Sequence, residues 1–212
     1  MEAQTARLEA QEINPEELAE QIMDNPDLLQ DILPGIFSEK ARVKFPIAKI
    51  LRTISEKEPG LLYPRFDFFI DLLDSDNNII KWNAMDIIAN LTAADEDNKF
   101  DRIFERYFSL LNDGSLITAG HVVDNSAKIA AAKPERREQI EALVLTVEEV
   151  PLPTSECRNI LAGKAILAFD QWFDVVEDKE AVVGFVHRQL NSSRNATKNK
   201  AAKFLKRRHI TS

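Results

Sequence analysis

Several residue types are scarce in this chain, and each scarcity excludes a class of protein. The single cysteine, Cys157, excludes a disulfide framework and any metal site built from several cysteines. Among the 212 residues there are only six glycines and nine prolines, which excludes collagen-like and low-complexity chains. No run of 18 apolar residues occurs, so no transmembrane helix is expected. The opening residues, MEAQTARLEAQEI, lack the apolar core of a signal peptide, which predicts a cytoplasmic protein with no membrane partner.

Basic residues are in deficit, with 27 against 35 acidic ones, and the two signs are unevenly distributed. Residues 1–33 carry nine acidic residues and one basic residue, whereas residues 188–212 carry eight basic residues and no acidic one. The formal net charge of −8 argues against a protein that coats nucleic acid with its whole surface. The two charged ends are expected to be either solvated terminal helices or docking surfaces for an oppositely charged partner.

Apolar residues recur at intervals of three and four rather than two, which predicts helices and almost no strands. In residues 79–91, for example, Ile80, Ala84, Ile87 and Ile88 fall on one helical face. Turn signals that contain Asn, Asp, Gly or Pro interrupt the pattern at intervals. The chain is therefore predicted to be all-α, with about ten helices joined by short turns.

A repeat of nearly constant length underlies these helices. Five predicted helix openings align, at spacings of 37, 38, 39 and 40 residues, on Lys44, Lys81, Ala119, Arg158 and Lys198. The residues three, four and seven positions after each aligned residue are small or apolar in every copy. Another apolar helix is predicted before each copy, over residues 26–33, 61–73, 100–111, 135–147 and 179–190.

Two turns carry a more specific pattern. Residues 72–84, LLDSDNNIIKWNA, have an apolar helix end, an Asp-rich turn, and then a cation followed three residues later by alanine. Residues 190–201, LNSSRNATKNKA, repeat the polar turn and the cation followed three residues later by alanine. Over residues 26–209 the chain resembles HEAT-type repeats, which are antiparallel helix pairs stacked side by side. The third copy departs most from this pattern, with Ala119 where the cation is expected.

The resemblance implies an α-solenoid of about five stacked antiparallel helix pairs. Residues 1–24 would form an acidic N-terminal helical cap, and residues 25–212 a single HEAT-like repeat domain that ends in a basic helix. In such repeats the second helix of each pair lines the concave surface. The residues that are expected to face a partner there are Trp82, Asp86, Asn90, His121, Asp124, Lys128 and Asn159. A basic patch is expected at Arg194, Lys198, Lys203 and Arg207.

A purely structural interpretation of these residues is equally open. The polar side chains can connect neighbouring repeats, with Asp124 and Lys128 as an ion pair one helical turn apart. Trp82 can pack half-buried against the next repeat instead of binding a partner. Trp172 and Cys157 are predicted to belong to the core.

No catalytic constellation is apparent in the sequence. His121 and Asp124 are one helical turn apart, but no serine or cysteine nucleophile is placed with them. Neither a glycine-rich phosphate loop nor a metal-ligand spacing occurs. We therefore expect a non-catalytic scaffold, without cofactor or metal, that binds a protein or peptide through its concave surface. The alternative is a nucleic-acid-associated HEAT-like protein, for example of the DNA alkylation repair type, which the acidic central region disfavours.

Overall fold

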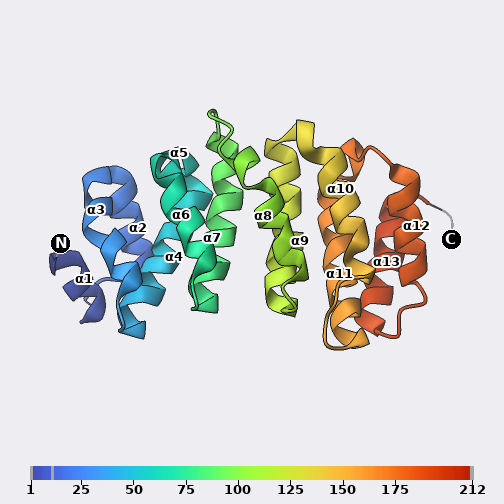
Figure 1. Ribbon diagram of the computed structural model, residues 1–212, viewed down its shortest axis with the longest axis horizontal. Coiled ribbons are helices and arrows are strands. Elements are labelled where there is room, and N and C mark those ends of the chain that lie inside the picture. The colour runs from blue at the N-terminus through green and yellow to red at the C-terminus, as the bar shows by residue number, and fades with distance from the viewer. Residues whose placement is uncertain (1, 11, 211–212) are drawn as a thin grey trace. The chain divides into compact units, whose positions relative to one another are not determined.

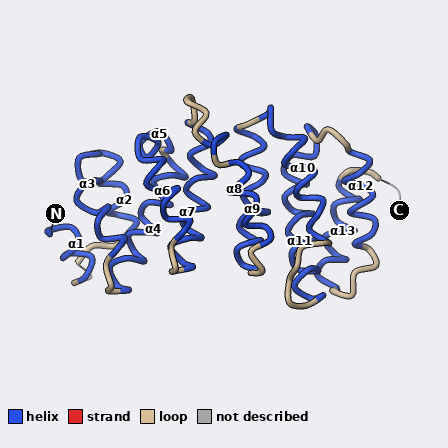
Figure 2. The backbone as a smooth tube through the Cα atoms, viewed as in Figure 1, coloured by secondary structure: helices blue, strands red, loops and turns tan. Residues whose placement is uncertain are grey.

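The computed structural model describes residues 2–10 and 12–210, and all regular structure in those ranges is helical. Figure 2 shows helices joined by loops, with no strand in the described part of the chain. This confirms the predicted all-α class. No helix among the described residues is both long enough and apolar enough to cross a membrane.

The chain divides into two compact units, residues 1–100 and residues 101–212. The helices of the first unit are α1 (Glu2–Glu9), α2 (Pro15–Asp24), α3 (Leu29–Ile32), α4 (Ala41–Lys57), α5 (Pro59–Leu62), α6 (Phe66–Asp71) and α7 (Asn78–Leu91). Those of the second unit are α8 (Phe104–Ser109), α9 (Leu116–Ala132), α10 (Arg137–Leu145), α11 (Ser155–Trp172), α12 (Lys179–Gln189) and α13 (Asn195–Arg207). The predicted separation of residues 1–24 as a cap stays a prediction; in the first unit, α1 and α2 pack against α4.

Five long helices follow the predicted repeat register. Helices α4, α7, α9, α11 and α13 each begin three residues before one of the five aligned positions. Successive long helices pack on one another within each unit: α4 against α7 in the first, and α9 against α11 and α11 against α13 in the second (Figure 1). Most of the segments that precede the long helices are short α-helices extended by single 3-10 turns.

Side-chain caps explain where three of the long helices begin. The side-chain oxygens of Asn77, Ser115 and Thr154 accept hydrogen bonds from the first backbone N–H groups of α7, α9 and α11. Such caps satisfy donors that have no partner inside the helix. The polar turn residues of the repeat motif therefore determine the start of the helix that follows them.

Apolar faces of the long and short helices meet in a continuous core within each unit. In the first unit the fully buried residues include Ile47, Phe66 and Ile88, and in the second they include Tyr107 and Phe185. Each such side chain contributes about 1.5–3 kcal/mol when it is removed from water.

The two predicted core residues of α11 have different environments. Trp172 is 5% exposed, which confirms its predicted place in the core. Cys157 is only half-buried, so its predicted core position is wrong. It lies in the first turn of α11, where its sulfur accepts a hydrogen bond from the hydroxyl of the capping residue Thr154 at 3.1 Å.

Ion pairs join residues that are 31 to 40 positions apart in the sequence, about one repeat length. In the first unit Glu9 pairs with Lys40 at 2.8 Å, and Glu16 pairs with Lys49. The hydrogen bond from each lysine lowers the pKa of its glutamate partner. In the second unit, Glu148 pairs with Arg188 at 2.7 Å. These pairs neutralise part of the acidic charge of residues 1–33 and part of the basic charge of residues 188–212. Because they are exposed, each contributes little to stability.

A buried carboxylate organises the turn that follows α7. Asp95 is 8% exposed and accepts hydrogen bonds from the Tyr63 hydroxyl at 2.7 Å, from the Lys99 N–H at 2.7 Å and from the Phe100 N–H at 3.0 Å. Desolvation, followed by the hydrogen bond to Asp95, raises the pKa of Tyr63 from 10.0 to about 12. The ionised phenol is therefore disfavoured in the folded chain.

Stability should consequently fall at high pH through Tyr63. The folded chain keeps a proton that the unfolded chain loses above its pKa of 10.0, so the contribution is present below pH 10 and is lost as the pH rises towards about 12. We expect denaturant midpoints between pH 9 and pH 11.5 to fall more steeply for the wild type than for Tyr63→Phe, which keeps the ring but cannot ionise. Equal slopes would contradict a raised pKa, and the difference in absorbance at 295 nm between the two proteins reports the titration directly.

Candidate partner-binding surfaces

The residues that were predicted to face a partner are divided between the two units. Trp82, Asp86 and Asn90 lie on α7 of the first unit, whereas His121, Asp124 and Lys128 lie on α9 and Asn159 on α11 of the second. A single surface that combines both groups stays a prediction. Each group is described within its own unit.

On α7, two of the three predicted residues connect helices within the first unit. Asn90 is 9% exposed, and its amide donates a hydrogen bond to the Ser55 hydroxyl of α4 at 2.9 Å. Its assignment to a partner surface is therefore wrong, because the side chain satisfies a buried polar group between two packed helices. Asp86 lies 3.6 Å from Arg52 of α4, with 15% of its side chain exposed. Trp82 is half-buried.

On α9, one of the predicted residues, Asp124, connects this helix to α11. Asp124 pairs with Lys164 of α11, the neighbouring long helix, which is a different partner from the predicted Lys128. The Lys164 stem crosses Gly120, where an added Cβ would lie 3.1 Å from the lysine Cε. The missing side chain thus leaves the space through which Lys164 reaches Asp124.

The same arrangement recurs between α11 and α13. The stem of Lys200 crosses Gly163, where an added Cβ would lie 3.5 Å from the lysine Cδ. Burial lowers the pKa of Lys200 and the positive charge of Lys164 lowers it further, whereas the carboxylate of Asp124 acts in the opposite direction. No carboxylate of the described residues lies within ion-pair distance of the Lys200 ammonium group.

The predicted basic patch is less cationic than its sequence suggests. Arg194 pairs with Glu156, and Arg207 pairs with Asp170. Asn159, next to this patch, donates from its amide to the Ser193 hydroxyl at 2.8 Å and is half-buried. The other two members of the patch are lysines, one exposed and one half-buried, Lys203 and Lys198.

These observations define one polar surface in the second unit, which we call the long-helix face. It consists of Asp124, Lys128, Asn159, Lys164, Lys200 and Lys203. Helical spacing places Lys128 one turn after Asp124, and Lys203 one turn after Lys200. Lys164 is paired with Asp124, so Lys200 and Lys203 are the cations through which this face is suited to acidic groups on a partner.

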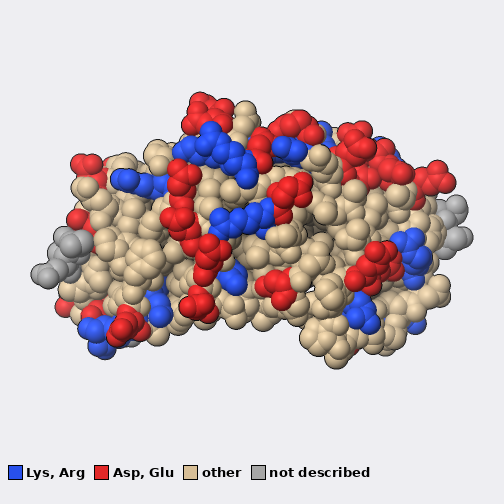
Figure 3. Space-filling model, in the orientation of Figure 1, with Lys and Arg blue, Asp and Glu red and all other residues tan. Residues whose placement is uncertain are grey.

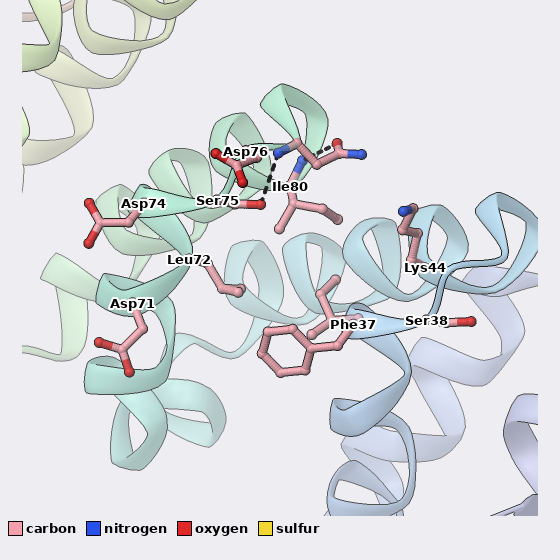
Figure 4. A pocket seen from close by; sticks show the side chains of 11 residues that line it. Phe37, Ser38, Lys44, Asp71, Leu72, Asp74, Ser75, Asp76 and Ile80 are labelled. Atoms are coloured by element: carbon pink, nitrogen blue, oxygen red, sulfur yellow. Dashed lines mark hydrogen bonds between the residues drawn. The ribbon is translucent and has the colours of Figure 1, made fainter.

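A pocket in the first unit was not anticipated from the sequence. It measures about 420 Å³ and lies between the end of the 3-10 helix η2 (Leu33–Phe37) and the turn before α7 (Figure 4). Figure 4 shows Phe37 and Lys44 on one side of it, Asp71 and Asp74 on the other, and Leu72 between them. The turn residues Asp74–Asn77 predict a helix break and form part of the repeat motif, but nothing in their spacing indicates that a hollow lies beside them.

Most of the charged side chains that line this pocket are acidic. On the face drawn in Figure 3, acidic side chains gather over α6 and the turn that follows it, beside an uncharged area. Phe37 is 67% exposed, which is the highest value among the large hydrophobic residues that are exposed in the described chain. An exposed phenylalanine next to a hollow is typical of an interaction surface.

The described residues include no cluster of His, Cys, Asp or Glu that could hold a metal ion. His121 is half-buried on α9, and its neighbour Asp124 is engaged by Lys164. Comparisons of the chain with models of known families, with curated proteins and with solved structures found no match.

Proposed function

We propose that the chain is a non-catalytic HEAT-like repeat protein, a solenoid of about five helix pairs, that binds a protein or peptide partner along its long helices. The observation that carries this proposal is the common register of the five long helices, which begin at equivalent positions of a repeat of 37 to 40 residues. Packing between successive long helices and ion pairs about one repeat apart support it further. Stacked repeats expose an extended surface, and the step from that architecture to partner binding is an analogy at the level of the fold.

The chemistry of the long-helix face narrows the class of partner. Lys203 is exposed on this face, and Lys200 is partly desolvated. A partner carboxylate that reaches Lys200 would stabilise a charge that has no ion pair among the described residues. An acidic peptide or an acidic protein surface is therefore the partner that we propose.

Nucleic acid is the second candidate, because the same lysines could contact phosphates. Affinity for nucleic acid rises with the number of phosphates that protein cations neutralise, because each such contact releases counterions from the nucleic acid. Arg194, Arg207 and Arg208 of the basic end already pair with Glu156, Asp170 and Asp174. This neutralisation favours the protein partner over the nucleic acid.

Position-specific photo-cross-linking in extract of the native cells tests the proposal. A benzophenone amino acid replaces Lys128 or Lys203 on the long-helix face and, as the matched control, the exposed Glu138 on the short helix α10. We expect the same protein to be cross-linked from positions 128 and 203, at least about fivefold more strongly than from position 138, with no change after nuclease treatment and with loss at high salt. Equal products from all three positions, no product, or a product that requires nucleic acid would contradict the proposal.

A further inference from the structure

The exposed aromatic ring of Phe37 separates two hollows in the first unit. The first is the pocket of about 420 Å³ in Figure 4, whose apolar lining includes Ile36, Leu72 and Ile80. The second measures about 410 Å³ and is lined mainly by Leu33, Pro34 and Phe68, with Phe37 shared between the two. Either hollow is large enough for one bulky apolar side chain.

Local contacts hold this surface in place. The ring of Phe37 meets that of Phe68 edge to face, with centroids 5.8 Å apart. Across the first hollow, Ser75 accepts a hydrogen bond from the Asn77 N–H at 3.2 Å, and the Asn77 side chain caps α7. A surface that is already ordered loses little conformational entropy when a partner binds.

The charges around the first hollow indicate the chemistry of the partner. Three aspartates and one lysine line it: Asp71, Asp74, Asp76 and Lys44. Asp71 and Asp76 are both exposed, and no ion pair joins either of them to another described residue. The carboxylates disfavour nucleic acid and anionic lipid, and they favour a cationic group beside the apolar contact.

We propose that this surface is a docking site for a basic amphipathic segment of a partner protein. One large apolar side chain of the segment enters the first hollow, next to Phe37. A neighbouring lysine or arginine of the segment faces Asp71 and Asp76. The site lies in the first unit and shares no residue with the long-helix face, so it does not depend on the proposed function. The cross-linking experiment at positions 128 and 203 and the experiment below can therefore fail independently.

A random 16-residue peptide library displayed on phage and selected on the intact chain provides the probe. We expect the enriched peptides to contain Phe, Leu or Trp next to Lys or Arg and to carry a net positive charge. Synthetic fluorescent copies should bind about tenfold more weakly to Phe37→Glu, because that change places a charge in the apolar contact. They should also bind about three- to tenfold more weakly to the double variant Asp71→Lys, Asp76→Lys, which reverses the charge and leaves the aromatic ring in place.

The matched control is Ile117→Glu, which places the same charge on another exposed apolar residue, 53% exposed, in the second unit. Its peptide affinity should equal that of the wild type, and circular dichroism verifies that every variant is folded. The proposal would be overturned if Phe37→Glu retained peptide binding, or if the enriched peptides were acidic or uncharged. It would also be overturned if the wild type enriched no peptides beyond those that Phe37→Glu enriches. Sedimentation of the chain alone adds a further test: self-association that Phe37→Glu abolishes would identify a second copy as the occupant and would also overturn it.

Discussion

Replacing Asp95 by alanine should destabilise the first unit by about 3 kcal/mol, which is the largest effect that we expect from a single polar residue. The carboxylate satisfies the Lys99 and Phe100 N–H groups and the Tyr63 hydroxyl, and Asp95 itself is 8% exposed. Alanine removes all of these acceptors and leaves donors without a partner in a site with little access to water. Urea unfolding followed by circular dichroism measures the loss, and faster hydrogen exchange of the Lys99 amide would locate it.

The exposed neighbour Asp97 provides the control for this change. Its backbone N–H contacts the Tyr63 hydroxyl at 3.2 Å, a contact that Asp97→Ala retains, so that variant should change stability by less than about 0.5 kcal/mol. Asp95→Asn should lie between the two, because the amide keeps one acceptor oxygen. Comparable stabilities for Asp95→Ala and Asp97→Ala would contradict the organising role of the buried carboxylate.

Replacing Gly163 by valine should destabilise the second unit by about 1–3 kcal/mol through overpacking. A Cβ at this position would lie 2.9 Å from the hydroxyl oxygen of Thr197 and 3.5 Å from the Cδ of Lys200. Thr197 is 1% exposed, and its hydroxyl donates to the Asn159 carbonyl oxygen at 2.7 Å, so it cannot move away without losing that bond. Thermal unfolding measures the loss of stability, and faster hydrogen exchange of amides in α11 and α13 would locate it at the contact between these helices.

A second helical glycine of the same unit provides the comparison. At Gly184 of α12, an added Cβ meets only the Arg188 guanidinium, at 3.9 Å. Gly184→Ala should therefore stabilise the chain by about 0.5–1 kcal/mol, which is the helix-propensity gain, whereas Gly163→Ala should show no such gain. If both alanine variants are stabilised equally, the close approach of α13 to Gly163 does not limit packing.

The helices could be predicted from the sequence because their causes are local. The period of the apolar residues and caps such as Asn77 and Ser115 act within a few residues, and all five long helices begin at the predicted register. The aligned positions also indicated which faces are buried. The predicted core position of Cys157 was wrong, since the first turn of a helix can extend beyond its neighbours, and the predicted exposed position of Asn90 was wrong because it is buried against α4.

The surfaces could not be predicted in the same way, because their partners lie a whole repeat away. Asp124 pairs with Lys164 rather than with Lys128, and Asn90 bonds to Ser55 of the preceding long helix. No local spacing distinguishes a polar residue that contacts solvent from one that faces another helix. The hollow beside Phe37 was missed for the same reason, since it exists only where the short helices leave an aromatic ring uncovered.

The ion pairs between the first two helices and α4 also determine how fragments of this chain would behave. A fragment that lacks α1 and α2 would lose Glu9, Glu16 and Glu20, which are the partners of Lys40, Arg42, Lys49 and Lys57. It would gain an unbalanced row of cations along α4, beside apolar side chains that α2 normally covers. Such a fragment would adhere to polyanions and to itself through a surface that the intact chain keeps neutral, so binding partners found with shortened forms would reflect the missing helices rather than the protein.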